Sequence, residues 1–200
     1  MKHKSNDYRK QTNYLKAIII CHGASEYHIA KHIKSNLRLK IEVDGKDNGK
    51  HSIQINSILN FLNTVPYKSK TYFIKKFKDN LPNGTINSEF KIFIIMDTDD
   101  EELTSDDIKN FKNKNMFKGH WTYNYIVPIY NTQNLEDVLL KAKIIDKTFG
   151  DKKEYAKIFP INNNAGIVDI KQIQNMYNIL KPITDTNMDI LLEYLLNLLK

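Results

Sequence analysis

Two short runs of almost wholly apolar residues constrain the fold of this chain more than any other feature. Residues 17–20 read Ala-Ile-Ile-Ile, and residues 90–96 are apolar except for Lys91. Both runs are short and rich in β-branched side chains, which is typical of strands buried on both faces of a parallel sheet. Each run is followed by polar residues and then by a helical pattern. The chain therefore alternates strand with helix, and this pattern predicts an α/β fold with a mainly parallel sheet flanked by helices.

The remaining elements follow the same alternation, with no internal repeat. In the first helix, Ile29, Ile33 and Leu37 recur at intervals of four and form one buried stripe. Further strands are predicted over residues 37–43, 125–130 and 156–159, and further helices over about 52–63, 105–115, 170–180 and 187–199, around Phe73 and Phe77, and from about 134. We expect a polar arm at 1–13, an α/β domain at 14–150, and at 151–200 a C-terminal strand and a helical cover that pack on the same core.

Composition excludes several classes of protein. The 200 residues are 41% apolar and 26% charged, and the longest apolar runs are far too short to span a membrane. Cys21 is the single cysteine, so an internal disulfide is excluded and a reducing, cytoplasmic location is expected. The net charge of +7 invites a polyanionic partner, yet Arg9 and Arg38 are the only arginines among the 30 basic residues. Since nucleic-acid recognition relies on arginine, charge alone is a weak indication of that partner.

Polar residues follow directly on three of the predicted strands, at residues 21–26, 97–100 and 131–136. In parallel α/β folds this carboxyl edge of the sheet is where sites are built. Asp97 and Asp99 lie at i and i+2, so their oxygens can converge on a hard divalent cation, with Asp100 beside them. The alternative is that this acidic run only solvates a loop and begins a helix.

The order of these motifs over residues 14–143 resembles the Toprim fold of topoisomerases, primases and OLD-type nucleases. Residues 23–26, Gly-Ala-Ser-Glu, resemble the Glu-Gly-x-x-Thr-Glu turn of RloB-like proteins, a group linked to restriction and phage-defence loci. Residues 130–136, Tyr-Asn-Thr-Gln-Asn-Leu-Glu, are similar to that group's Ser-Asn-Pro-x-Phe-Glu segment, which places Glu136 near the metal site.

The resemblance implies a Mg²⁺- or Mn²⁺-dependent phosphodiesterase or nuclease that acts on DNA or RNA in a phage-defence or mobile-element system. An ATPase or another defence protein could be its partner. The metal ligands implied are Asp97, Asp99, Asp100 and Glu136. The family glutamate that precedes the first glycine is His22 here, so His22 is the predicted proton-transfer group. Glu26, one helical turn further on, would orient His22 or join the metal in place of the missing carboxylate.

The loop that follows the second predicted strand is a further candidate. Residues 45–52 resemble a phosphate-binding loop that is one residue short, and Lys46, Lys50 and His51 are the predicted nucleic-acid contacts. Residues 117–125 interleave aromatic and basic side chains, a pattern used both for stacking on single strands and for ordinary core packing. His28 and His32 have the i, i+4 spacing of metal ligands but flank the apolar stripe of the first helix, which favours a solvated helix edge.

Two alternatives to the nuclease hypothesis stay open. The same surface could belong to a non-catalytic module, on a degenerate Toprim fold, that binds nucleic acid or protein. Residues 20–26 are also similar to the Arg-His-Gly-x-Ser-Glu start of the histidine phosphatases, in which His22 would be phosphorylated. Cys21 stands where the first arginine of that motif should be, and that reading leaves Asp97 and Asp99 unexplained.

Overall fold

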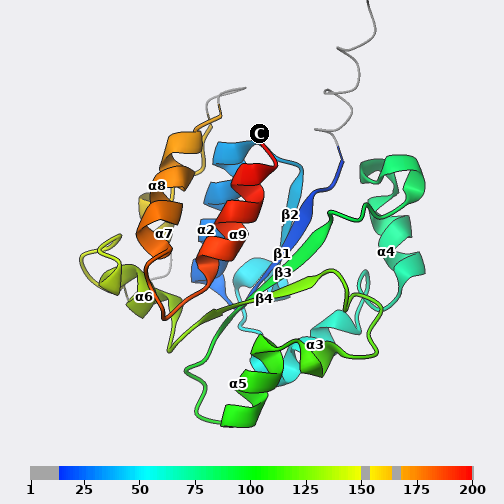
Figure 1. Ribbon diagram of the computed structural model, residues 1–200, viewed down its shortest axis with the longest axis horizontal. Coiled ribbons are helices and arrows are strands. Elements are labelled where there is room, and N and C mark those ends of the chain that lie inside the picture. Colours follow the sequence, from blue (N-terminus) through cyan, green and yellow to red (C-terminus); the bar gives the residue numbers. More distant parts are fainter. Residues whose placement is uncertain (1–13, 150–153, 164–167, 200) are drawn as a thin grey trace, which may run out of the picture.

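The computed structural model describes residues 14–149, 154–163 and 168–199. Its sheet has four parallel strands in the order β2-β1-β3-β4 (Figure 1). The strands are β1 (Ala17–Cys21), β2 (Ile41–Asp44), β3 (Lys91–Asp97) and β4 (Ile126–Asn131). The predicted fold class is confirmed. The chain leaves β1 for β2 on one side and returns to β3 on the other, so a topological switch point lies between β1 and β3.

Helices cover both faces of the sheet. In Figure 1 one layer holds α2 (Ala24–Leu37), α6 (Leu135–Lys141), α7 (Tyr155–Ile158), α8 (Ile170–Leu180) and α9 (Met188–Asn197). The other layer holds α3 (Ile58–Leu62), α4 (Lys70–Phe77) and α5 (Ser105–Lys112). Short 3₁₀ turns join these elements: η1 (Lys46–Gly49), η2 (Ile55–Ser57), η3 (Lys78–Asn80), η4 (Pro82–Gly84) and η5 (Asn115–Phe117).

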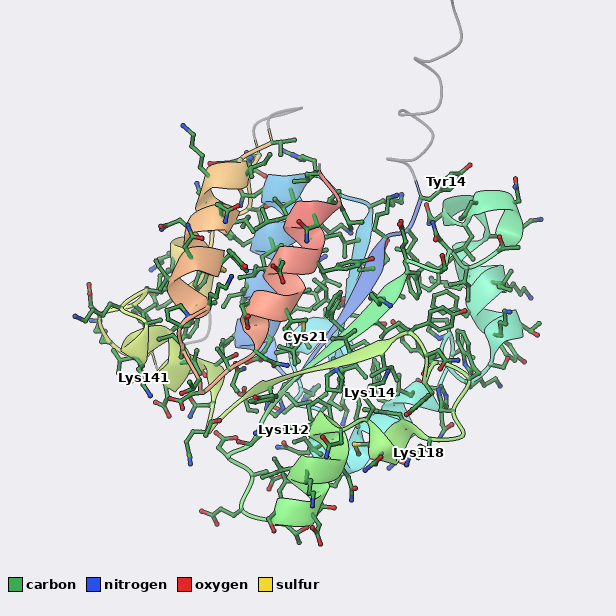
Figure 2. The ribbon with its side chains drawn as sticks, in the orientation of Figure 1. Tyr14, Cys21, Lys112, Lys114, Lys118 and Lys141 are labelled. Carbon is green, nitrogen blue, oxygen red and sulfur yellow. The ribbon has the colours of Figure 1, made fainter. Side chains whose placement is uncertain are left out.

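Alternation along the strands decides which layer each side chain meets. Ile19, Cys21 and Ile95 pack in the core under α2 and the C-terminal helices, whereas Ile18 and Ile94 pack in the core under α3 to α5. Cys21 is fully buried and lies at the centre of the molecule between the two layers (Figure 2). Because both faces of the sheet are covered, the two central strands β1 and β3 have nearly continuous apolar sequences, whereas the edge strand β2 alternates apolar and acidic residues. Asp97 continues the odd-numbered series of β3 and so faces the α2 layer.

Three of the predicted elements differ most from the structure. The predicted strand at 156–159 is wrong: this segment forms the short helix α7, which places Tyr155 and Phe159 on one buried side against α2. The predicted helix at 52–63 is shorter, because residues 52–54 are not helical and η2 precedes α3. The predicted strand at 37–43 begins only at Ile41, because Leu37 still belongs to α2. The segments from 155 and from 170 belong to the same core cluster as β1 and β3. The polar arm predicted at 1–13 lies outside the described residues. No helix in the described part of the chain is long and apolar enough to cross a bilayer.

Candidate metal centre

The carboxyl ends of β1 and β3 open into a pocket of about 340 Å³, on the edge of the sheet where the switch point lies. The parallel register pairs Cys21 with Ile95 and Asp97 with Asn131, so the residues after these strands meet at one edge. The N-terminal turns of α2 and α6 form the opposite wall of the pocket. This arrangement explains how residues far apart in the sequence share one site.

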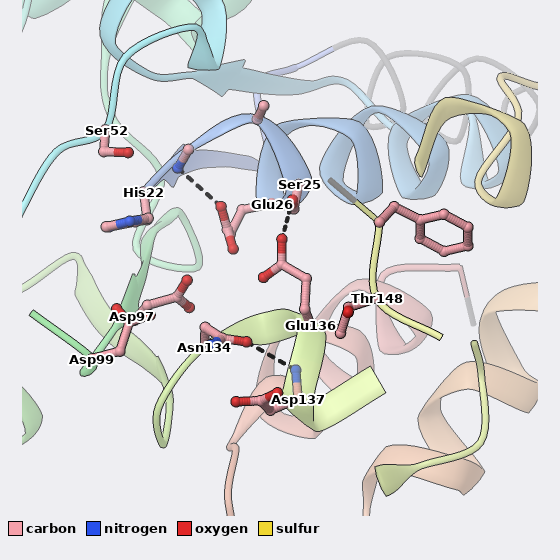
Figure 3. Close-up of a pocket in the computed structure, with 13 residues that line it drawn as sticks. His22, Ser25, Glu26, Ser52, Asp97, Asp99, Asn134, Glu136, Asp137 and Thr148 are labelled. Carbon is pink, nitrogen blue, oxygen red and sulfur yellow. Dashed lines mark hydrogen bonds between the residues drawn. The ribbon is translucent and has the colours of Figure 1, made fainter. Parts of the chain in front are cut away.

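Three buried carboxylates converge in this pocket. Glu26 from α2, Asp97 from the end of β3 and Glu136 from α6 each offer an oxygen, and these oxygens lie within 4.8 Å of one another. Figure 3 shows the three carboxylates pointing toward a common centre. All three side chains are less than 9% exposed. Among the described residues that line the pocket there is no lysine or arginine to balance their charge.

Each of these carboxylates is held by a hydrogen bond to one of its oxygens. The Gly23 backbone N–H donates to Glu26 Oε2 at 2.9 Å, at the N-terminus of α2. The Ser25 hydroxyl donates to Glu136 Oε1 at 2.7 Å. The Asn131 amide donates to Asp97 Oδ1 at 2.9 Å. The carboxylates are therefore oriented in advance, as ligands of a metal usually are.

One fully buried oxygen in the cluster has no hydrogen-bond partner among the described residues. Glu26 Oε1 accepts no hydrogen bond from any part of the chain that the structure describes. Leaving a buried carboxylate oxygen without a donor costs free energy, because the oxygen has lost the water it would bind in the unfolded chain. The place of Glu26 at the N-terminus of α2 does not explain why Oε1 is buried without a donor, since the hydrogen bond at the helix N-terminus is made by Oε2. The unpartnered oxygen and its two neighbouring carboxylates are what a cation would satisfy.

The electrostatics of the pocket agree with that interpretation. Burial and the nearby charge of Glu26 raise the pKa of Asp97 to about 9, although the hydrogen bond from Asn131 opposes the shift. Burial likewise raises the pKa of Glu26, and the charge of Glu136 adds to this effect. Without a cation Asp97 therefore holds its proton at neutral pH, because its ionised form would be buried beside other carboxylates that repel it. A divalent ion would reverse that preference.

His22 lies at the side of this pocket and is tied to the loop that follows β2. Its ring Nδ1 lies 2.9 Å from the carbonyl oxygen of Ile53, which can only accept, so Nδ1 carries a hydrogen. The Ile53 N–H in turn donates to the carbonyl oxygen of His22 at 2.8 Å. Nδ1 is therefore engaged in holding the loop, and Nε2 is the nitrogen left for proton transfer.

The other two predicted metal ligands, Asp99 and Asp100, lie outside the three-carboxylate cluster. Asp99 lines the pocket but is not part of the three-carboxylate cluster. Asp100 is not among the described lining residues, and its Oδ1 accepts a hydrogen bond from the backbone N–H of Glu102 at 3.0 Å. An i, i+2 pair converges only while the chain stays extended, and β3 ends at Asp97. The Thr98 N–H then donates to the carbonyl oxygen of Gln133 at 2.8 Å, which starts the turn.

Two polar residues behind Asp97 complete the site and were not predicted as part of it. Asn131 is fully buried, and its Oδ1 accepts a hydrogen bond from the Thr186 hydroxyl at 2.9 Å. Because the Thr186 oxygen already accepts a hydrogen bond from the Met188 N–H at 3.2 Å, its own hydrogen goes to Asn131 Oδ1, and the NH₂ group of Asn131 faces Asp97. Asn131 was noted at the end of its strand, whereas nothing in the sequence indicates that Thr186, 55 positions later, contacts it.

The remaining candidates lie away from the three carboxylates. Lys46 lines a neighbouring hollow, and Lys50 and His51 are exposed on the same loop, where His51 pairs with Asp47 at 3.4 Å. His32 is buried and hydrogen-bonds through Nδ1 to the carbonyl oxygen of Pro160 at 2.7 Å. In the aromatic stretch, Phe117 is fully buried, and Tyr123 has Lys114, from just before the stretch, over its ring. Lys112 lies over the ring of Tyr130, which follows the stretch, and both lysines are on the α5 side of the molecule (Figure 2).

Fold and site together define an α/β protein with a preorganised cluster of buried carboxylates at the switch point of a parallel sheet. Comparison of the chain with protein-family models, with curated proteins and with solved structures gives no match in any of the three. The resemblance to Toprim proteins of the RloB-like and OLD-type group therefore stays a prediction, and function is argued from the site alone.

Proposed function

We propose that this protein is a metal-dependent phosphodiesterase that acts on nucleic acid, with Mg²⁺ or Mn²⁺ held by Glu26, Asp97 and Glu136. The observation that carries the proposal is the buried, unpartnered Oε1 of Glu26, which lies in a cluster of oxygens within 4.8 Å of one another. Carboxylate oxygens are hard ligands, and an all-oxygen set favours Mg²⁺ or Mn²⁺ over zinc or copper. Compared with the ligand set predicted from sequence, Glu26 takes the place of Asp99 and Asp100.

Such an ion, when bound, would lower the pKa of a water and stabilise the charge that develops on a transferring phosphoryl group. The protein's own residues supply the rest. Asp97 and Glu136, held by Asn131 and Ser25, would keep the ligand oxygens in place. His22 Nε2 would accept or return the proton at the attacking or leaving oxygen, because Nδ1 is committed to Ile53. Asp99 at the mouth of the pocket would bind a second ion or the water shell of the first.

Phosphoryl transfer through His22 is less well supported by this site. A phosphorylated histidine needs cations around the transferred group, whereas the described residues that line this pocket include carboxylates and no arginine. Arg38 instead donates to the carbonyl oxygen of Asn162 at 2.7 Å. The non-catalytic alternative shares the metal cluster with the phosphodiesterase, so an activity assay must decide between them.

The test is an incubation of the wild type, Asp97→Asn and Glu26→Gln with plasmid, single-stranded DNA and tRNA, each with Mg²⁺, with Mn²⁺ and with a chelator. We expect cleavage that needs the metal and falls at least about 100-fold in both variants, because each loses a ligand charge. His22→Ala should lower turnover by about 10²-fold or more at saturating metal.

Glu101→Gln, an exposed change in the same acidic run, is the matched control. Full activity of Asp97→Asn would refute the proposal, and metal binding without cleavage would favour the non-catalytic module.

A further inference from the structure

A second hollow, of about 430 Å³, adjoins the carboxylate pocket. Ser52 lines both, so the two hollows meet at this residue. Lys46 from η1 and Asn60 and Phe61 from α3 form much of its wall, with Ile53 beneath. Its volume is in the range of small-molecule pockets. Because it lies next to the carboxylate cluster, it could hold another part of a ligand that is bound at the metal.

The chemistry of this hollow is opposite to that of the carboxylate pocket. No described residue that lines it is acidic, and Lys46 supplies one cation. Within the described part of the chain Lys46 makes no ion pair with a carboxylate. The Phe61 ring lines the hollow and has Tyr67 behind it, with 5.8 Å between the ring centroids. These groups match the parts of one nucleotide. The cation can bind a phosphate, the aromatic ring can stack on a base, and the small polar groups can hydrogen-bond the edge of that base.

The loop that carries this hollow is fixed with respect to the three carboxylates. Ile53 and His22 exchange two hydrogen bonds, at 2.8 and 2.9 Å. Gly49 packs so closely on α2 that a Cβ atom added there would lie 2.7 Å from the Cβ atom of Tyr27. The distance between the cluster and the hollow is therefore set by the fold, as a subsite beside a reacting phosphate requires.

From this arrangement we infer that the hollow binds the nucleotide next to the scissile phosphate of a single-stranded nucleic acid, with its base on Phe61 and a phosphate at Lys46. This inference rests on the proposed function. A base in a duplex is paired and stacked, so it cannot enter a side pocket unless it is flipped out, whereas the bases of a single strand are free to stack on protein rings. The protein should therefore prefer single strands with intact bases.

The test is a binding measurement by fluorescence anisotropy, with Ca²⁺ as the ion. The probes are fluorescein-labelled dT₁₀, rU₁₀, an abasic decamer with the same number of phosphates, and a blunt duplex. We expect the wild type to bind dT₁₀ or rU₁₀ about 5- to 150-fold more tightly than the abasic decamer, the range that stacking of a base on an aromatic side chain provides. The DNA and RNA arms identify the natural strand.

Two variants assign the effect to this hollow. Phe61→Leu should abolish the preference for bases while keeping the apolar volume, and Lys46→Gln should weaken binding of both decamers equally. Tyr72→Leu and Lys75→Gln, exposed changes on α4, are the matched controls for loss of a ring and of a charge. Equal affinity of the wild type for the intact and abasic decamers, absence of binding, tighter binding of the duplex, or a preference that survives in Phe61→Leu would each overturn the inference.

A parallel incubation of dT₁₀ and rU₁₀ with Mn²⁺ separates this inference from the proposed function. Cleavage without any preference for bases would overturn the nucleotide subsite and leave the phosphodiesterase standing. A preference for bases that Phe61→Leu abolishes, without cleavage of either strand, would support the subsite and count against the phosphodiesterase.

Discussion

At the scale of single residues, the site depends on a hydrogen-bond chain that reaches the metal cluster from behind. The Thr186 hydroxyl donates to Asn131 Oδ1, and Asn131 Nδ2 donates to Asp97 Oδ1, each at 2.9 Å. An asparagine amide can rotate by half a turn with almost no change in shape, and the turned amide would present its oxygen to the oxygen of Asp97. Thr186 prevents that rotation, so it is a positioning residue for the metal ligand.

We therefore expect Thr186→Val to weaken Mn²⁺ binding by about 10-fold, the lower range for the loss of a group that orients a ligand. Thr186→Ser keeps the hydroxyl and should bind Mn²⁺ as the wild type does. Isothermal titration calorimetry at constant pH measures both affinities. A merely structural role would lower the stability of Thr186→Val without changing the affinity for Mn²⁺, and that result would refute the positioning role.

How much of the site the sequence predicts also depends on particular residues. Asp97, Glu136 and Glu26 could be singled out because each lies at the end of a strand or in the first turn of the helix that follows it. Sequence alone could not determine that Asp99 leaves the cluster, because this depends on where β3 ends and on the contact between Thr98 and the carbonyl oxygen of Gln133. Thr186 could not be found at all, because its contact with Asn131 exists only after the C-terminal segment has docked.

At the scale of elements, the strands were predictable and the segment from 154 to 163 was not. Runs such as 17–21 and 91–97 have a composition that few other structures share, because both of their faces are buried. By contrast, residues 156–159 read Ala-Lys-Ile-Phe, a mainly apolar run of only four positions that fits a strand and a single helical turn equally well. Packing decided the outcome: as a helix, the segment buries Tyr155 and Phe159 together against α2.

The contact that holds this segment on α2 predicts a pH dependence. His32 is 3% exposed, stacks edge-on against Phe159 and bonds to the Pro160 carbonyl oxygen. Burial lowers the pKa of His32 below its ordinary value near 6.5. Below that pH the unfolded chain therefore binds more protons at this residue than the folded chain, so acidification through this range favours unfolding.

Urea unfolding at pH 7.5 and at pH 5.0 measures this effect when the wild type is compared with His32→Gln. The amide of glutamine can still donate to the Pro160 carbonyl oxygen but takes up no proton in this range. We expect His32→Gln to cost about 1 kcal/mol at pH 7.5 through imperfect packing and to lose less stability than the wild type on acidification. If the two proteins lost the same stability on acidification, His32 would have the same pKa in the folded and the unfolded chain, and the prediction would be wrong.

At the scale of the whole molecule, the buried carboxylate cluster opposes folding unless a cation is bound. The described residues that line the pocket around Glu26, Asp97 and Glu136 include no lysine or arginine, so ionisation of the cluster is supported only by His22, by hydrogen bonds and by the N-terminal turns of α2 and α6. The same three groups belong to α2, β3 and α6, which come from different parts of the chain. A bound ion would therefore add a direct link between elements that already meet through the sheet, the apolar core and the hydrogen bond from Ser25 to Glu136.

Thermal melts with and without Mn²⁺ test this dependence on the intact protein. An ion that binds only the folded state at 100 times its Kd adds about 2.7 kcal/mol, which for a chain of this size raises the midpoint by roughly 5–10 °C. Asp97→Asn removes one ligand charge from the metal-bound protein and, from the metal-free protein, a buried acid whose raised pKa opposes folding at neutral pH. In chelator this variant should melt at or above the wild-type temperature, whereas in Mn²⁺ the wild type should melt higher. Two results would show that the cluster is not a metal site. One is a wild-type melting midpoint that does not change on addition of Mn²⁺ or Mg²⁺. The other is an Asp97→Asn variant whose midpoint rises with metal as much as that of the wild type. The expected reversal arises because the carboxyl groups must be ionised to bind the ion, and their burial disfavours that ionisation when no ion is present.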